Sequence, residues 1–377
     1  MRVWPLASIL CLAVACTGAG NAPPDAQSAD AGRADAASAA DAQAGSDAAG
    51  GADAAGGADG GQPDSGPPYN CGAFSGDPGW TVQAGFRAVT IADQGDGLQQ
   101  PVALVFAGGA FSNQLFVVNQ GDNVLRAIDV RTGTVTLRVA TAAWPVTPRL
   151  LTSITWDVDS VFDGNLYVAD QGGDGDADSI IFRVEPTGTA TVFARAPGPA
   201  MDDVYALVFA SSSSYAPGLY VSGDTDGAGA DWARIGADGQ INAFSEVAGV
   251  EGAVFDRGGA YGRRIIAARP AGGGYAGDGT ITAIEGNGAA GRIFASSLGG
   301  IHAVVLSPGG AFGPYLYAAS WSAGELLRID PTGAVEVVAS GLSLTNYDGN
   351  ILAFSPDGQV LYVADRLAHR VVCIEPL

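Results

Sequence analysis

One pattern of short segments recurs six times between residues 100 and 377, and it constrains the fold more than any other feature of the chain. Each copy has an apolar segment ending in a bulky residue, a Gly-rich turn, a segment of the LYVAD type, an Arg-containing segment and, after another turn, a last apolar segment. The bulky residues are Phe106, Trp156, Phe209, Phe255, Leu306 and Phe354, spaced 50, 53, 46, 51 and 48 residues apart. Repetition at such a period predicts one supersecondary unit per copy, stacked against its neighbours around a continuous core.

Short β-branched and aromatic segments separated by turn residues are typical of the four-stranded blade of a β-propeller. Six copies therefore predict an all-β, six-bladed propeller with four-stranded antiparallel blades. The last copy ends after its third segment, at VVCIEPL (371–377), whereas an unassigned segment, FRAVTIA (86–92), precedes the first copy. We expect 86–92 to lie beside 369–375 as the outermost strand of the last blade, which closes the ring.

The repeats resemble those of six-bladed propellers of the NHL-repeat type and of the SMP-30/gluconolactonase-like superfamily. The resemblance rests on phrases such as AFSPDGQVLYVAD (353–365) and LLRIDPTGAVEVVAS (326–340), and it covers the whole repeated region. It implies the propeller fold, but many unrelated functions share this repeat pattern. For the lactonases of this superfamily, the resemblance implies a divalent metal on the propeller axis, held by Glu, Asn and Asp side chains.

The first residues, MRVWPLASILCLAVAC (1–16), are typical of a secretory signal, because one Arg precedes an apolar stretch too short to span a membrane. Residues 13–16 are similar to the lipobox of bacterial lipoproteins, which implies a lipid on Cys16. The alternative is an ordinary cleaved signal that ends near a cysteine. We therefore expect an exported protein of the cell envelope, lipid-anchored in the outer membrane or at the cell surface.

Residues 17–68 consist almost wholly of Ala, Gly, Asp, Ser and Pro and contain no aromatic residue, Leu, Ile or Val. A segment of this composition cannot bury enough apolar surface to offset the entropy lost on ordering. It predicts a disordered tether between the signal (1–16) and the propeller (69–377).

The composition excludes several classes of function. The chain has a net charge of −21, and its 18 basic residues are all Arg. Such acidity argues against nucleic-acid binding, which needs a basic surface, and the absence of Lys excludes Schiff-base chemistry. We find no phosphate loop, Gly-x-Ser-x-Gly or HExxH motif, so we expect no nucleotide or organic cofactor. Membrane contact is expected only through the lipid, and the protein is expected to be a monomer.

Two cysteines lie in the propeller region. In an exported protein such cysteines commonly form disulfides. Cys71 lies shortly before the strand 86–92, which is expected to pair with the strand that contains Cys373. A Cys71–Cys373 bridge would lock the ring, and the alternative is two free thiols.

One set of candidate functional residues surrounds the propeller axis. The innermost strands begin on the face that also carries the loops between second and third strands. Four positions before each bulky residue lie Val102, Thr152, Tyr205, Glu251, His302 and Asn350, and Asp203 and Asp348 come two positions earlier in their blades. Glu251, Asn350 and Asp348 match the residue types that hold the lactonase metal, and His302 would shift the preference toward transition metals. In this interpretation Asp203 is the base that activates water; the alternative is an ordinary polar channel mouth.

Acidic loops offer another candidate site, for a calcium ion. Asp174, Asp176 and Asp178 have the spacing of a calcium loop, but the strand expected at 180–184 carries Glu185 too far away for an EF-hand. A looser calcium site remains, shared with Asp224 and Asp226 of the next blade. The alternative is that Asp/Gly loops simply form tight, hydrated connections.

Further binding residues are expected at the ends of the second strands, on the same acidic top face: Asp170, Arg269, Trp321, Asp365 and Arg366. The sequence thus favours a surface-tethered, non-enzymatic propeller that binds a protein, glycan or small-molecule ligand through this face. One alternative is a divalent-metal-dependent hydrolase of the lactonase type, with Ca²⁺ or another divalent cation as cofactor. Another is a structural spacer in the envelope.

Overall fold

The computed structural model describes residues 68–172, 178–196, 201–224, 231–270, 279–345 and 349–377. Several predicted site residues lie outside these ranges: Cys16, Asp174, Asp176, Asp226 and Asp348. The predicted signal and nearly all of the predicted tether lie outside them as well. Within the described ranges, no helix is long and apolar enough to cross a membrane.

The strands form six antiparallel sheets, each running from an innermost strand outward. Blade one has β3 (Pro101–Ala107), β4 (Gln114–Asn119), β5 (Val124–Asp129) and β6 (Thr134–Val139), and blade two has β7 (Leu151–Trp156), β8 (Leu166–Asp170), β9 (Ile180–Val184) and β10 (Ala190–Arg195). Blade three has β11 (Asp202–Ala210), β12 (Gly218–Asp224), β13 (Trp232–Ile235) and β14 (Ile241–Ser245), and blade four has β15 (Gly252–Phe255), β16 (Ile265–Arg269), β17 (Thr280–Ile284) and β18 (Ala290–Ala295). Blade five has β19 (Ile301–Leu306), β20 (Leu316–Ser320), β21 (Glu325–Ile329) and β22 (Val335–Ser340), and blade six has β23 (Leu352–Phe354), β24 (Leu361–Asp365), β25 (Arg370–Pro376) and β2 (Phe86–Ala92).

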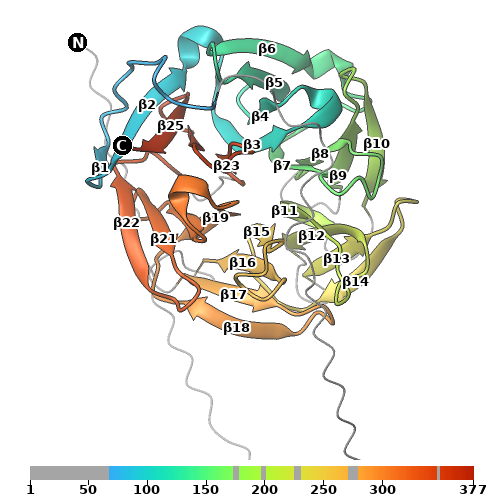
Figure 1. Cartoon of the computed structure of the whole chain (residues 1–377). Helices are drawn as coiled ribbons and strands as arrows, with labels where there is room; N and C mark the ends of the chain where they lie inside the picture. Colours follow the sequence, from blue (N-terminus) through green and yellow to red (C-terminus); the bar gives the residue numbers. More distant parts are fainter. Residues whose placement is uncertain (1–67, 173–177, 197–200, 225–230, 271–278, 346–348) are drawn as a thin grey trace, which may run out of the picture. The chain divides into compact units, whose positions relative to one another are not determined.

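Figure 1 shows these blades arranged in a ring, with β3, β7, β11, β15, β19 and β23 around the centre. This confirms the predicted six-bladed propeller. The helical segments in the described ranges are single 3₁₀ turns: η1 (Gln94–Asp96), η2 (Gly109–Phe111), η3 (Thr141–Ala143) and η4 (Gly310–Phe312). We call the face where the innermost strands begin the top face, and the face where they end the bottom face.

The ring closes as the sequence predicts. Strand β2 pairs antiparallel with β25, and Val89 lies opposite Cys373. Nearby, Cys71 and Cys373 form a disulfide that joins positions 302 residues apart, which confirms the predicted bridge. One addition was not predicted: β1 (Thr81–Val82) pairs with β22 and makes blade five five-stranded. Two residues are too few to produce a periodic pattern in the sequence.

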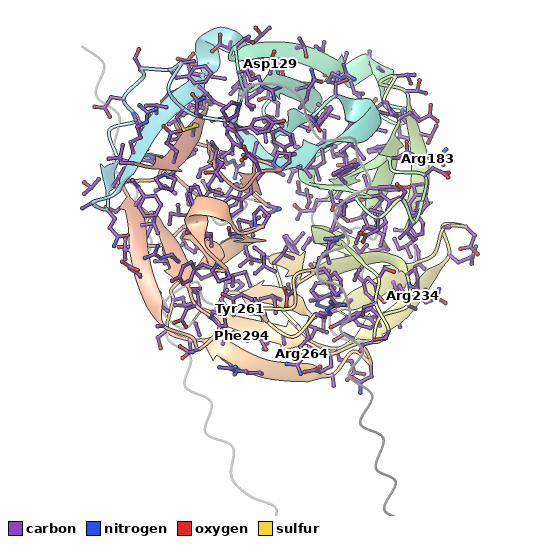
Figure 2. All side chains as sticks on the ribbon, viewed as in Figure 1. Asp129, Arg183, Arg234, Tyr261, Arg264 and Phe294 are labelled. Carbon is purple, nitrogen blue, oxygen red and sulfur yellow. A yellow bond between two sulfur atoms is a disulfide. The ribbon has the colours of Figure 1, made fainter. Side chains whose placement is uncertain are left out.

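The core lies between blades, because each second strand packs against a neighbouring blade on both faces. Every residue of β8, β20 and β24 is buried, so these strands show no alternation between polar and apolar residues. Aromatic rings from adjacent blades meet edge to face; the ring of Tyr167 in blade two, for example, lies 5.2 Å from that of Phe209 in blade three. The third-strand residues Arg183 and Arg234 lie toward the rim of the ring (Figure 2).

Tyrosines in the bottom-face turns add hydrogen bonds between blades. The hydroxyl of Tyr261, from blade four, donates to the carbonyl of Ile329 at 2.6 Å and accepts from the N–H of Leu316 at 2.9 Å, both in blade five. Tyr215 of blade three contacts blade four in the same way, through Ile284 and Ile265. These contacts fix the blades that carry the axial residues.

Candidate functional site

The acidic residues that end the second strands are used within the fold. Asp170 is 2% exposed, and its carboxylate accepts the N–H groups of Arg149 at 3.1 Å and Leu150 at 2.7 Å. Asp365 is fully buried, accepts the N–H of Ser343 at 2.7 Å and pairs with Arg370 at 2.6 Å. Both carboxylates therefore tie the incoming linker to its blade instead of projecting from the top face.

Arg366 and Arg269 are also engaged in local contacts. The guanidinium of Arg366 donates to Gln120 of blade one and to Thr345 of the linker before blade six. Gln120 in turn donates to the carbonyl of Leu151 at 3.0 Å, so Arg366 belongs to a chain of bonds that spans three blades. Arg269 donates to the carbonyl of Ala248 at 2.8 Å and remains partly exposed.

Glu251 and His302 form the most unusual group at the axis. Glu251 directly precedes β15 and His302 lies in β19, and the Glu251 carboxylate contacts Nδ1 of the imidazole. The His302 side chain is 3% exposed and that of Glu251 is 14% exposed. A Cβ atom at Gly252 would lie 1.9 Å from the carbonyl oxygen of His302, so the close approach of the two strands depends on glycine at this position.

Three buried polar atoms near the axis have no hydrogen-bond partner among the described residues: Glu251 Oε2, His302 Nε2 and Asn350 Oδ1. For Glu251 the contact with His302 is close but not aligned as a hydrogen bond. These residues occupy the same position in blades four, five and six. Folded proteins pair more than about 90% of their buried polar groups, and unpaired ones concentrate where function requires them.

Trp321 extends this group toward solvent. Its ring lies edge to face with the His302 ring, at a centroid distance of 5.9 Å. The indole also packs on Gly300, where a Cβ atom would lie 1.9 Å from Nε1. Trp321 stays partly exposed, so it offers a fixed aromatic surface beside Glu251 and His302. We call Glu251, His302 and Trp321 the axial triad.

Asp203, the predicted base, lies at the start of blade three. Its carboxylate accepts a hydrogen bond from Nε2 of Gln171 at 2.9 Å, and its backbone is left-handed, with φ of 45°. Thr152 of blade two donates to the carbonyl of Val204, the residue after Asp203, at 2.9 Å. The start of β11, with Asp203, is therefore held against neighbouring blade two.

The predicted axial metal set is only partly assembled in the described residues. Glu251 and His302 contact each other, Asn350 offers an unpaired oxygen, and Asp348 lies outside the described ranges. No group of three His, Cys, Asp or Glu side chains suited to a metal occurs in the part of the chain that the structure describes. The described residues thus supply two candidate oxygen ligands and no complete site.

The acidic loops are described only in part. Asp178 forms an ion pair with Arg149 at 2.6 Å, and Asp224 ends β12. Strand β9 is extended from Ile180 to Val184, as predicted, and Glu185 follows it toward the bottom face, away from Asp178. This geometry agrees with the rejection of an EF-hand.

Sequence reasoning missed two buried carboxylates on the bottom face. Asp157 and Asp256 directly follow the bulky residue of their repeats and are at most 2% exposed. The Asp256 carboxylate accepts the N–H groups of Gly259, Tyr261 and Arg263 at 2.7–3.0 Å, and Asp157 holds its own turn in the same way. Their equivalent position in two repeats was the signal that could have revealed this role.

No family model matches the chain, and no curated protein matches it. Solved structures do match. A gluconolactonase from Xanthomonas campestris is 14% identical, with a TM-score of 0.57, covering 81% of this chain and 96% of that one. The PQQ-bound form of an aldose sugar dehydrogenase from Streptomyces coelicolor is 16% identical, with a TM-score of 0.53, covering 78% and 99%. A streptogramin B lyase is 12% identical, with a TM-score of 0.51, covering 78% and 99%. At these identities the likeness shows the fold alone.

Proposed function

We propose that this protein is an exported ligand-binding propeller whose site is the axial triad on the top face. The observation that carries the proposal is His302 Nε2, a buried atom without a hydrogen-bond partner among the described residues, which lies beside Glu251 and the partly exposed Trp321. An unpaired buried polar group costs about 1–3 kcal/mol. A cost of this kind at the top face is explained more readily by ligand binding than by the needs of the fold.

The chemistry of the triad favours an uncharged, hydroxyl-rich ligand. Trp321 offers an aromatic face on which the apolar face of a sugar ring can pack, and Glu251 accepts hydrogen bonds from hydroxyl groups. The net charge of −21 disfavours anionic ligands. Two of the similar structures are named for acting on sugars or their lactones, which supports a glycan or a sugar-derived small molecule.

The N-terminal segments complete the proposal. Residues 1–16 would direct export, Cys16 would carry the lipid, and 17–68 would separate the propeller from an outer-membrane or cell-surface anchor. In this arrangement the propeller acts as a monomer.

Calorimetric titration of the mature protein with a panel of neutral sugars and oligosaccharides tests the binding role. We expect saturable binding that is lost in Trp321→Leu and weakened at least about tenfold in Glu251→Gln, which corresponds to about 1.4 kcal/mol. Trp144→Leu, between blades one and two, is the control, because Trp144 is buried against Phe182 of the third strand β9 and not at the axis. Equal affinity in all variants would place the ligand elsewhere, and absence of any binding would favour the spacer interpretation.

A divalent-metal-dependent lactonase is the second candidate, and the Glu251 carboxylate and the unpaired oxygen of Asn350 favour it. Together with Asp348 they would hold the cation, which would supply Lewis-acid polarisation of a lactone carbonyl. Asp203 would accept a proton from water. Elemental analysis and a lactone panel test this role: stoichiometric metal and turnover lost in Glu251→Ala support it, whereas turnover unaffected by chelation contradicts it.

A further inference from the structure

A cavity lies on the bottom face, opposite the axial triad. Its volume is about 380 Å³. It is lined by the innermost strands of blades one, two, five and six and by the turns that follow them, including Val105, Trp156, Val305, Leu306 and Phe354. Because β3, β7, β19 and β23 surround the centre of the ring (Figure 1), the cavity lies on the axis.

The central channel of the ring narrows at the inner end of this cavity. A Cβ atom at Gly349 would lie 1.9 Å from the carbonyl oxygen of Thr152 and 3.1 Å from that of Val102. The backbone before β23 is therefore packed against blades one and two. Asn350, the next residue, lines the cavity, and its Oδ1 has no hydrogen-bond partner among the described residues. The cavity thus has an amide at its narrow end.

The walls are mostly apolar, with Asn113, Asn350 and Ser355 as the polar lining residues. The described residues that line the cavity include no charged side chain, although the chain carries a net charge of −21. The indole Nε1 of Trp156 donates to the carbonyl of Gly164 at 3.2 Å, and Cη2 of the ring lies 3.2 Å from where a Cβ atom at Gly108 would sit. The Trp156 ring is therefore held in place as one wall of the cavity before any ligand arrives.

We propose that this cavity binds a small, uncharged aromatic alcohol. The volume falls within the usual range of small-molecule sites, about 300–1,000 Å³. The ligand ring packs against Trp156 and Phe354, and its hydroxyl pairs with the Asn350 amide, because a hydroxyl can both donate and accept. The lining offers no positive charge for an anion, and its mostly apolar walls favour an aromatic ring over a sugar. None of the three triad residues lines this cavity, and Asn350 is the one residue that it shares with the lactonase interpretation above.

Three matched probes test the proposal on the mature protein by quenching of tryptophan fluorescence and calorimetry. We expect 2-naphthol to bind with 1:1 stoichiometry, naphthalene to bind at least fivefold more weakly, and the anion 2-naphthoate to show no saturable binding. Absence of saturable 2-naphthol binding, or equal binding of 2-naphthoate, overturns the proposal.

Variants then locate the site. Ala353→Leu and Val305→Phe each fill the cavity from a different strand, and either one that keeps the wild-type circular dichroism should lose 2-naphthol binding. Asn350→Leu should remove the preference for naphthol over naphthalene. Trp321→Leu, on the opposite face, should bind 2-naphthol as the wild type does. Unchanged binding in a folded cavity-filling variant, or loss of binding in Trp321→Leu alone, contradicts the assignment.

Discussion

The carboxylate of Glu251 contacts Nδ1 of His302 across the boundary between blades four and five. Both residues occupy the same position in successive repeats, so the ring geometry itself brings them together. The contact uses Nδ1 of the imidazole, and Nε2 is left buried without a partner among the described residues. The contact orients the imidazole against Trp321 and leaves the Glu251 side chain partly exposed at the axis.

A double-mutant cycle measures this contact. We expect Glu251→Gln and His302→Gln each to destabilise the protein, because each replaces the carboxylate–imidazole contact by one of different charge and shape in a largely buried place. Urea unfolding of the two single variants and the double variant should give a coupling energy of about 0.5–3 kcal/mol. A coupling energy indistinguishable from zero would show that the contact does not contribute to stability.

Gly349 is expected to tolerate no side chain. In Gly349→Ala the added Cβ would meet the Thr152 carbonyl oxygen at 1.9 Å, and neither group is the end of a flexible side chain. Overpacking of this kind costs about 1–3 kcal/mol. Gly258→Ala is the matched control, since its nearest neighbour, the Asp256 carboxylate, would lie 3.9 Å away. Equal melting temperatures for the two variants would contradict the close approach.

The Cys71–Cys373 disulfide should stabilise the protein strongly. It closes a loop with a sequence separation of 302 residues, for which chain entropy gives an upper value of roughly 5 kcal/mol. We expect Cys71→Ala, Cys373→Ala and the double variant to lose similar stability, because each removes the same bond. Reducing agent should lower the melting temperature of the wild type only. A further loss on reducing the double variant would point to a different cause.

Alkaline pH should unfold the propeller through its buried tyrosines. Burial raises the pKa of Tyr215, Tyr220 and Tyr317 to about 12, so the folded state holds these protons more tightly than the unfolded chain does. Their contribution to stability is complete below about pH 10 and is lost as the pH rises toward 12, by up to about 1.4 kcal/mol per pH unit for each tyrosine. Absorbance at 295 nm should show these tyrosines ionising together with unfolding. Ionisation near pH 10 in a protein that stays folded would contradict their burial.

Calcium should raise the melting temperature if the acidic loops bind it. The Asp178 carboxylate already pairs with Arg149, so the ion must compete with that contact. We expect a smaller calcium-dependent increase in the variant Asp174→Asn/Asp176→Asn, and the same increase as wild type in Asp238→Asn, which lies in an outer turn. Identical responses of all three proteins would exclude these loops.

The repeats made the architecture predictable, whereas side-chain roles depended on contacts that no repeat encodes. The pairing of β2 with β25 followed from counting strands. The last repeat lacked a fourth segment, and the segment 86–92 belonged to no repeat. The sequence pattern placed Asp170 and Asp365 correctly at the ends of their strands. It did not distinguish a carboxylate that faces solvent from one that accepts hydrogen bonds from backbone N–H groups. The narrow axis at Gly349 depends on a backbone approach between blades far apart in sequence, which the sequence pattern does not report.

Blade six combines β2, near the start of the propeller in sequence, with β25 at its end. During synthesis, residues 86–92 therefore remain without their strand partner until residues 370–376 have emerged, and unpaired strands can associate with wrong partners. The Cys71–Cys373 bond likewise requires both ends of the repeated region. Once formed, it holds the two ends of the ring together beside the joint where β2 meets β25.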